Sequence, residues 1–153
     1  MENLVISNNN LTNCVILCES YGGYFKLLMK NEDNAEMGCI VFKFNSAKRH
    51  IWLQKIETKK EFQHLGVASI LMYSLENIAV ESKCYRIEGT YYPTNDYALP
   101  FYLKHGYYVP NQKKRWDLYD QTWRLTKDLV YGDVKQNYKN FVEAFTINMQ
   151  EKK

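Results

Sequence analysis

A single glycine, Gly66, stands where a polar run passes into a helix-forming run, and this junction limits what the chain can fold into. The preceding residues 59–65, KKEFQHL, are mostly polar. After Gly66, apolar side chains recur three and four residues apart, which is the spacing of an amphipathic helix; they are Val67, Ile70, Leu71, Leu75 and Ile78. Because glycine usually marks the end of a helix and not its start, Gly66 needs another explanation.

Strand-like runs precede this junction and are separated by polar or glycine-containing turns; they cover residues 13–19, 24–30, 37–44 and 50–58. Their spacing of about a dozen residues predicts an antiparallel meander. The pattern after the junction differs. It predicts, in order, a helix over 66–82, a strand over 84–92, a helix from about Leu99 to Gly106, a strand starting at 107–109 and a strand over 117–129. We therefore expect an α/β fold with a mixed, mostly antiparallel sheet flanked by helices.

The C-terminal residues 131–153 have a pattern of their own. Apolar side chains fall on one helical face between 132 and 149; they are Val134, Tyr138, Phe141, Val142 and Phe145. This predicts an amphipathic helix that docks either on its own domain or on a second copy of the chain. We expect one domain over residues 1–130, followed by this helix.

Composition excludes several classes of function. The 153 residues are 46% apolar and 24% charged, which is typical of one globular domain. A net charge of +3 is too small for a nucleic-acid-binding surface. No apolar run approaches the roughly 20 residues of a membrane helix, and the N-terminus lacks the pattern of a signal peptide. We expect a cytoplasmic protein without nucleic-acid or membrane partners.

The cysteines Cys14, Cys18, Cys39 and Cys84 have no zinc-like spacing to one another or to the histidines. Three of them lie in apolar, strand-like runs. We therefore expect buried free thiols and no metal site.

A phosphate-binding turn explains Gly66 better than a stop signal. The first turn of a helix leaves backbone N–H groups without partners, and the helix dipole adds partial positive charge there. A glycine at this point lets an anion approach the backbone closely. The neighbouring Lys59 and Lys60 would favour an anionic ligand.

Two motifs carry a resemblance to a known family. The Walker and dinucleotide patterns are absent, but Gln63-x-x-Gly66-x-Ala68 resembles the [RQ]-x-x-G-x-[GA] pyrophosphate motif of the GNAT acetyltransferase superfamily. A second GNAT segment has Asn, Ala, Tyr, Gly and an aromatic at offsets of zero, three, seven, eleven and twelve. The matching residues are Asn95, Ala98, Tyr102, Gly106 and Tyr107.

The resemblance implies acetyl-CoA as donor and CoA as product, held where two central strands splay apart. Ile56 to Thr58 would supply backbone groups to the pantetheine arm, as in strand addition. Asn95, Ala98 and Tyr102 would line the other side of the donor. Backbone amides would hold the pyrophosphate; they belong to Gln63, His64, Leu65, Gly66, Val67, Ala68 and Ser69.

The implied reaction is direct N-acetylation of a small-molecule or peptide amine. Tyr102 occupies the family position of the general acid, and a phenol with a pKa of about 10 is protonated at neutral pH. Glu57 is a candidate base, beside Glu88 and His105. Water-mediated deprotonation and entry of a neutral amine stay open as alternatives.

One departure from the family concerns the acceptor side. Family members place two helices between their first two strands, but no such pattern precedes residue 37 here. That side is either more open than usual or covered by the C-terminal helix or by the second subunit of a homodimer. Two other functions stay open: a non-catalytic acyl-CoA-binding module, or a protein-interaction domain that uses the C-terminal helix.

Overall fold

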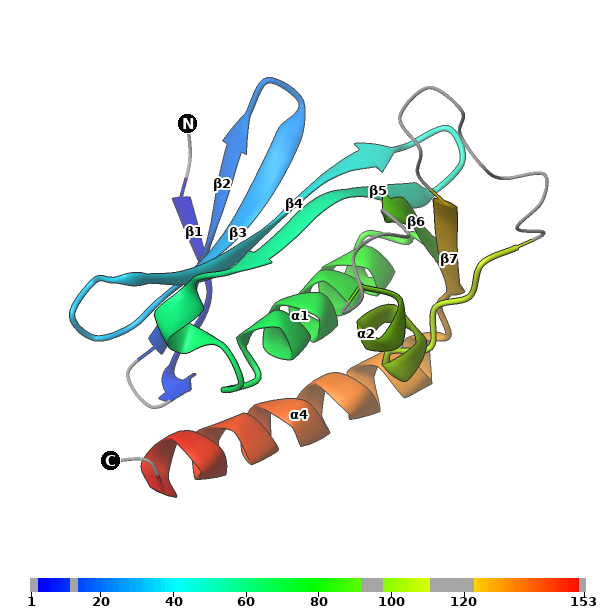
Figure 1. Ribbon diagram of the computed structural model, residues 1–153. Helices are drawn as coiled ribbons and strands as arrows, with labels where there is room; N and C mark the ends of the chain where they lie inside the picture. The colour runs from blue at the N-terminus through cyan, green and yellow to red at the C-terminus, as the bar shows by residue number, and fades with distance from the viewer. Residues whose placement is uncertain (1–2, 12–13, 92–97, 111–122, 152–153) are drawn as a thin grey trace.

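Strands from the first third of the chain pair in chain order into a twisted sheet (Figure 1). The computed structural model describes residues 3–11, 14–91, 98–110 and 123–151. Its strands are β1 (Asn3–Leu11), β2 (Cys14–Tyr21), β3 (Tyr24–Lys30), β4 (Glu36–Asn45), β5 (His50–Thr58), β6 (Arg86–Tyr91) and β7 (Trp123–Asp128). Its helices are the 3₁₀ turn η1 (Lys60–Phe62), α1 (Val67–Glu81), α2 (Ala98–Lys104) and α4 (Tyr131–Glu151).

The sheet has the order β1-β2-β3-β4-β5-β6-β7, so every strand lies beside its neighbour in sequence. All pairs are antiparallel except β5 and β6, which are parallel. A parallel pair needs a crossover connection, and α1 supplies it. The expected mixed, mostly antiparallel α/β fold is confirmed.

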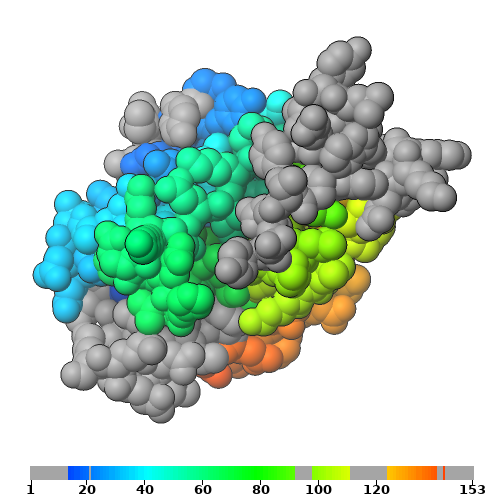
Figure 2. All heavy atoms as spheres, viewed as in Figure 1, coloured from blue at the N-terminus to red at the C-terminus, as the bar shows by residue number. Residues whose placement is uncertain are grey.

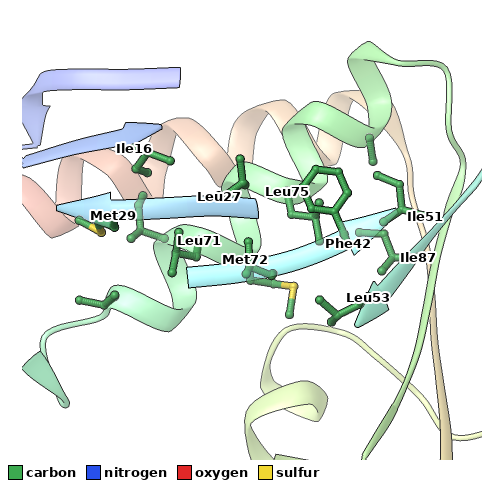
Figure 3. Packing of buried hydrophobic residues seen from close by; sticks show 14 of the residues in the cluster. Ile16, Leu27, Met29, Phe42, Ile51, Leu53, Leu71, Met72, Leu75 and Ile87 are labelled. Carbon is green, nitrogen blue, oxygen red and sulfur yellow. The ribbon is translucent and has the colours of Figure 1, made fainter. Parts of the chain in front are cut away.

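Helix α1 packs its apolar face against one face of the sheet and forms the core (Figure 3). Leu71, Met72 and Leu75 are fully buried on the helix side. The sheet contributes fully or almost fully buried side chains from five strands: Ile16, Leu27, Met29, Phe42, Ile51, Leu53 and Ile87. Burial of each such side chain stabilises the fold by about 1.5–3 kcal/mol.

Helix α4 docks on its own chain, where it contacts α1 and β1 (Figure 1). Val134 is buried, and the Tyr131 hydroxyl donates a hydrogen bond of 3.3 Å to Glu81 at the end of α1. Of the two docking modes that the sequence left open, the structure shows the intramolecular one. Helix α4 lies on the side of the sheet that α1 covers, and not on the opposite face.

The structure differs from the expectations in two places. No strand was expected before residue 13, but β1 forms there by pairing with β2, despite its polar sequence. The strand expected at 107–109 is wrong, since it is only a single bridge between Tyr108 and Thr126. The last strand ends at Asp128 and is described only from Trp123, so most of its expected N-terminal part lies outside the described residues.

The described residues contain no helix before η1, as the sequence led us to expect. All four cysteines are free; Cys14, Cys39 and Cys84 are buried and Cys18 is half-buried, so the expectation of free, mostly buried thiols is confirmed. No helix in the described part of the chain has the length and apolar character needed to cross a membrane. Nor do the described residues include a cluster of three or more side chains suited to holding a metal ion.

Candidate active site

Strands β5 and β6 separate halfway along their length. Their parallel pairing runs from His50–Arg86 to Leu53–Gly89 and stops there, although β5 continues to Thr58 and β6 to Tyr91. A Cβ atom on Gly89 would lie 3.0 Å from the Leu53 carbonyl oxygen, so glycine allows the close approach at the last pair. Beyond that point no described strand pairs with β5 on its β6 side. Backbone groups of β5 are therefore open to a ligand.

A bulge lies at the same place. Phe42 of β4 pairs with Leu53, whereas Val41 pairs with Lys55, so Gln54 is an extra residue in β5. Bulges redirect side chains and increase the local twist of a strand. Here the bulge coincides with the point at which β5 leaves β6.

The turn before α1 presents bare backbone. Gly66 is the N-cap residue with φ +86° and ψ 13°, a left-handed conformation that favours glycine. No side chain caps the helix, and the Ile70 N–H donates a hydrogen bond to the Gly66 carbonyl. His64 also has positive φ, +66°, and its side chain is exposed. The uncapped amides are suited to bind an anion.

A cavity of about 390 Å³ occupies the gap between the two strands. Its lining comes from β5, β6, α1 and α2, and consists of Gln54, Lys55, Ile56, Glu57, Thr58, Ala68, Thr90, Tyr91, Ala98, Phe101 and Tyr102. Loop 59–66 and α2 lie on the same face of the molecule (Figure 2). We refer to this cavity as the cleft.

The structure brings together some of the residues singled out in the sequence. Ile56, Glu57, Thr58, Ala98 and Tyr102 all line the cleft, together with Ala68. The remaining turn residues do not line it but lie in the adjoining loop and first turn of α1; they are Gln63, His64, Leu65, Gly66, Val67 and Ser69. Asn95 lies outside the described residues.

Tyr102 is buried, and burial raises the pKa of its phenol to about 12. Its ring packs edge-on against Phe101 and Tyr107. The hydroxyl therefore keeps its proton well above neutral pH and is available only as a donor or acceptor of hydrogen bonds, or as an acid toward a strong base.

Glu57 forms ion pairs with Lys55 at 2.8 Å and with Lys59 at 3.4 Å. The hydrogen bond and charge of Lys55, followed by Lys59, lower the pKa of the Glu57 carboxyl. The carboxylate stays ionised at neutral pH, but the two lysines make it a weak base.

His105 has a role that local sequence does not reveal. The residue is buried, with Nε2 2.8 Å from Ser69 Oγ and its ring near those of Tyr73 and Phe101. Burial, followed by the charges of Lys127 and Lys104, lowers its pKa to about 4. A neutral imidazole thus connects the end of α2 to the first turn of α1. Because 36 residues separate the partners, no local pattern could have indicated this contact.

Comparison with known families gave one match. The family model described as Acetyltransferase (GNAT) family covers residues 13–107, which includes the splayed strands, the bare turn and α2. Comparison with curated proteins gave no match.

Several solved structures share the fold. Nourseothricin acetyltransferase is 18% identical, with a TM-score of 0.61 over 69% of this chain and 65% of that one. PaiA N-acetyltransferase from Thermoplasma acidophilum, in complex with coenzyme A, is 19% identical, with a TM-score of 0.61 over 70% and 62%. An acetyltransferase from Bacillus cereus ATCC 14579 is 22% identical, with a TM-score of 0.56 over 69% and 73%. The present chain thus spans less than two thirds of the length of the first two.

Proposed function

Because the chain belongs to the acetyltransferase (GNAT) family, we propose that it transfers an acetyl group from acetyl-CoA to a primary amine. The observation that carries this proposal is the cleft between β5 and β6, which adjoins the uncapped first turn of α1. Acetyl-CoA needs both the cleft and the uncapped turn. Its diphosphate requires N–H donors, and its extended pantetheine arm requires free strand backbone.

Each part of the site has a proposed task. The amides of residues 63–69 bind the diphosphate, and the backbone of Ile56 to Thr58 pairs with the pantetheine arm. Ala98 and Tyr102 close the opposite wall of the cleft, and Asn95 is proposed to contact the donor from the same side. Bound acetyl-CoA supplies the activated acetyl group.

The chain then handles charge and protons. A backbone N–H at the end of β5 stabilises the negative charge that develops on the thioester oxygen as the amine attacks. Tyr102 donates its proton to the departing sulfur as the carbon–sulfur bond breaks. Glu57 is proposed to receive the proton that the amine nitrogen loses as the amide forms. Since two lysines weaken it as a base, an amine that enters already neutral is favoured.

A thiol-release assay tests the proposal. Purified protein is mixed with acetyl-CoA and members of several amine classes, and the product is identified by mass spectrometry. Release of CoA that requires an amine, with formation of the acetylated amine, is the expected result. Binding of acetyl-CoA without release for any amine would indicate a non-catalytic acyl-CoA-binding module instead.

A further inference from the structure

A second cavity, of about 550 Å³, lies on the sheet face opposite α1. Along β6, Ile87, Gly89 and Tyr91 are buried toward the core, whereas Glu88 and Thr90 point to the other face. The cavity is lined by residues of this other face and of the adjoining turns: Ala47, Lys48, His50, Tyr85, Arg86, Glu88, Tyr108, Pro110, Arg124 and Thr126. We refer to it as the rear cavity.

Positive charge exceeds negative charge in this lining. Among the described lining residues Glu88 is the one carboxylate, against Lys48, Arg86 and Arg124. Glu88 is already engaged by His50 Nδ1 at 3.0 Å, and Arg86 Nε donates to Asp128 at 2.7 Å. An added anion would therefore find a net attraction, and a polycation would meet repulsion.

Arg124 is the lining cation best placed to hold a ligand. Its guanidinium lies over the Trp52 ring, with 5.9 Å between its Cζ atom and the ring centroid, and Nη1 is 3.8 Å from Glu88. The side chain is 48% exposed, so an added ligand can reach it. A planar guanidinium held in one orientation is suited to bind a carboxylate through two parallel hydrogen bonds.

Two contacts relate the rear cavity to the cleft through Arg124. Arg124 of β7 pairs in register with Thr90 of β6, and Thr90 lines the cleft. Trp52 Nε1 donates to the Gln54 side chain at 3.1 Å, and Gln54 also lines the cleft. The rise of two strand residues from Glu88 to Thr90 is about 7 Å. This length is within the reach of a small molecule.

We propose that the acceptor is an amine that also carries a carboxylate, with the carboxylate held by Arg124 in the rear cavity and the amine directed past Thr90 into the cleft. This inference rests on the proposed acetyl transfer and specifies its substrate class. The strand rise sets the separation between amine and carboxylate at about 7 Å, which a dipeptide or a medium-length ω-amino acid provides. Polyamines lack a carboxylate and are expected to be poorer acceptors.

The test compares matched amines in the thiol-release assay. Glycylglycine is expected to have a kcat/KM at least about tenfold above that of glycylglycinamide, because only the former has the carboxylate. Spermidine is expected to be a poorer acceptor than either. In a series of ω-amino acids from 3-aminopropanoate to 6-aminohexanoate, the longer members should have the lower KM.

Variants identify the site responsible. Arg124→Gln is expected to raise KM for glycylglycine about tenfold or more and to leave kcat/KM for the amide and the affinity for acetyl-CoA within about twofold. Lys43→Gln removes the same charge from the same sheet face, outside both cavities, and should change none of these values. Thermal melting confirms that both variants fold.

The inference is overturned by equal use of the acid and the amide, by a preference for spermidine, or by an Arg124→Gln variant with an unchanged KM. It is equally overturned if acetyl-CoA binds but no carboxylate-bearing amine is acetylated. Absence of acetyl-CoA binding in calorimetry would instead contradict the proposed function. In that case an NMR titration of wild type and Arg124→Gln with glycylglycine still tests the carboxylate site, and equal binding to both proteins refutes it.

Discussion

The Nε2 atom of His105 lies 2.8 Å from the Oγ atom of Ser69, and this contact joins the residue after α2 to the first turn of α1. The two helices form opposite sides of the cleft, one through Ala68 and the other through Tyr102. Nδ1 of His105 is buried and has no hydrogen-bond partner among the described residues. The bond to Ser69 is therefore the hydrogen bond that the described structure offers this ring.

Ser69→Ala is expected to lower the free energy of unfolding by about 1–3 kcal/mol, because it leaves the buried imidazole without its partner. Ser74→Ala is the matched control. Ser74 is also buried on α1, but its hydroxyl donates only to the Ile70 carbonyl of the same helix, so its loss should cost less. Urea denaturation measures both. Equal stability of the two variants would contradict a bracing role for the Ser69–His105 contact.

Stability should depend on the protonation of His105. The folded pKa of His105, about 4, is below the ordinary value of 6.5, so between these values the unfolded chain binds a proton that the folded chain does not. The contribution of this group is fully present above pH 6.5 and is lost as the pH falls toward 4. It amounts to at most about 3 kcal/mol.

His105→Gln should therefore lose less stability than wild type between pH 7 and pH 4.5 when denaturation is followed across that range. Carboxylates common to both proteins contribute equally and cancel in the comparison. Parallel pH curves for the two proteins would show that His105 titrates normally in the folded state.

Tyr102→Phe tests the proposed acid. We expect kcat to fall about 100-fold or more, within the range for general acids, while acetyl-CoA affinity changes by less than about twofold. With a pKa of about 12, wild-type Tyr102 should also give no loss of kcat between pH 7 and pH 10. Tyr24→Phe, a hydroxyl removal on β3 outside the cleft, is the control. Unchanged turnover of Tyr102→Phe would make this residue a packing group only.

A buried ion pair joins α1 to β7. The Lys127 ammonium lies 3.0 Å from a carboxylate oxygen of the fully buried Glu76, and Tyr107 donates to the other oxygen at 3.3 Å. Burial raises the pKa of the Glu76 carboxyl, and Lys127 opposes this. Lys127→Met should therefore destabilise the fold by about 3–5 kcal/mol, since it leaves a buried carboxylate without its cation.

Lys135→Met provides the comparison. It breaks the exposed Lys135–Glu81 ion pair between α4 and α1 and should destabilise the fold much less than Lys127→Met does, because solvent screens an exposed pair. Thermal denaturation of both variants under one buffer condition measures the difference. Similar losses for the two variants would be inconsistent with a structural role for the buried pair.

Much of the fold could be predicted, because local patterns of apolar and polar residues indicate most of its strands and helices. The bounds of β3 and β5 match the expected 24–30 and 50–58, and α1 begins one residue after Gly66, as its apolar periodicity indicates. Strand β1 could not be predicted, because its polar sequence becomes a strand only by pairing with β2.

Some residues of the candidate site could likewise be predicted from the sequence, and others could not. Gly66 and Tyr102 were found from spacing and from the family resemblance, and the structure places Tyr102 in the cleft beside the Gly66 turn. The roles of His105 and Arg124 depend on partners in other elements, such as Ser69 and Trp52, so they require the tertiary structure.

The proposed function depends on the bare turn at Gly66 binding the diphosphate of acetyl-CoA, and calorimetry of three proteins measures this binding. Gly66→Ala and Gly22→Ala both place alanine at positive φ, +86° and +56°, but Gly22 lies in a hairpin turn where an added Cβ would have no atom within 4 Å. We predict micromolar binding of acetyl-CoA to wild type and to Gly22→Ala, and binding at least about tenfold weaker for Gly66→Ala. No binding to wild type at millimolar acetyl-CoA, or equal affinity of all three proteins, would contradict the account.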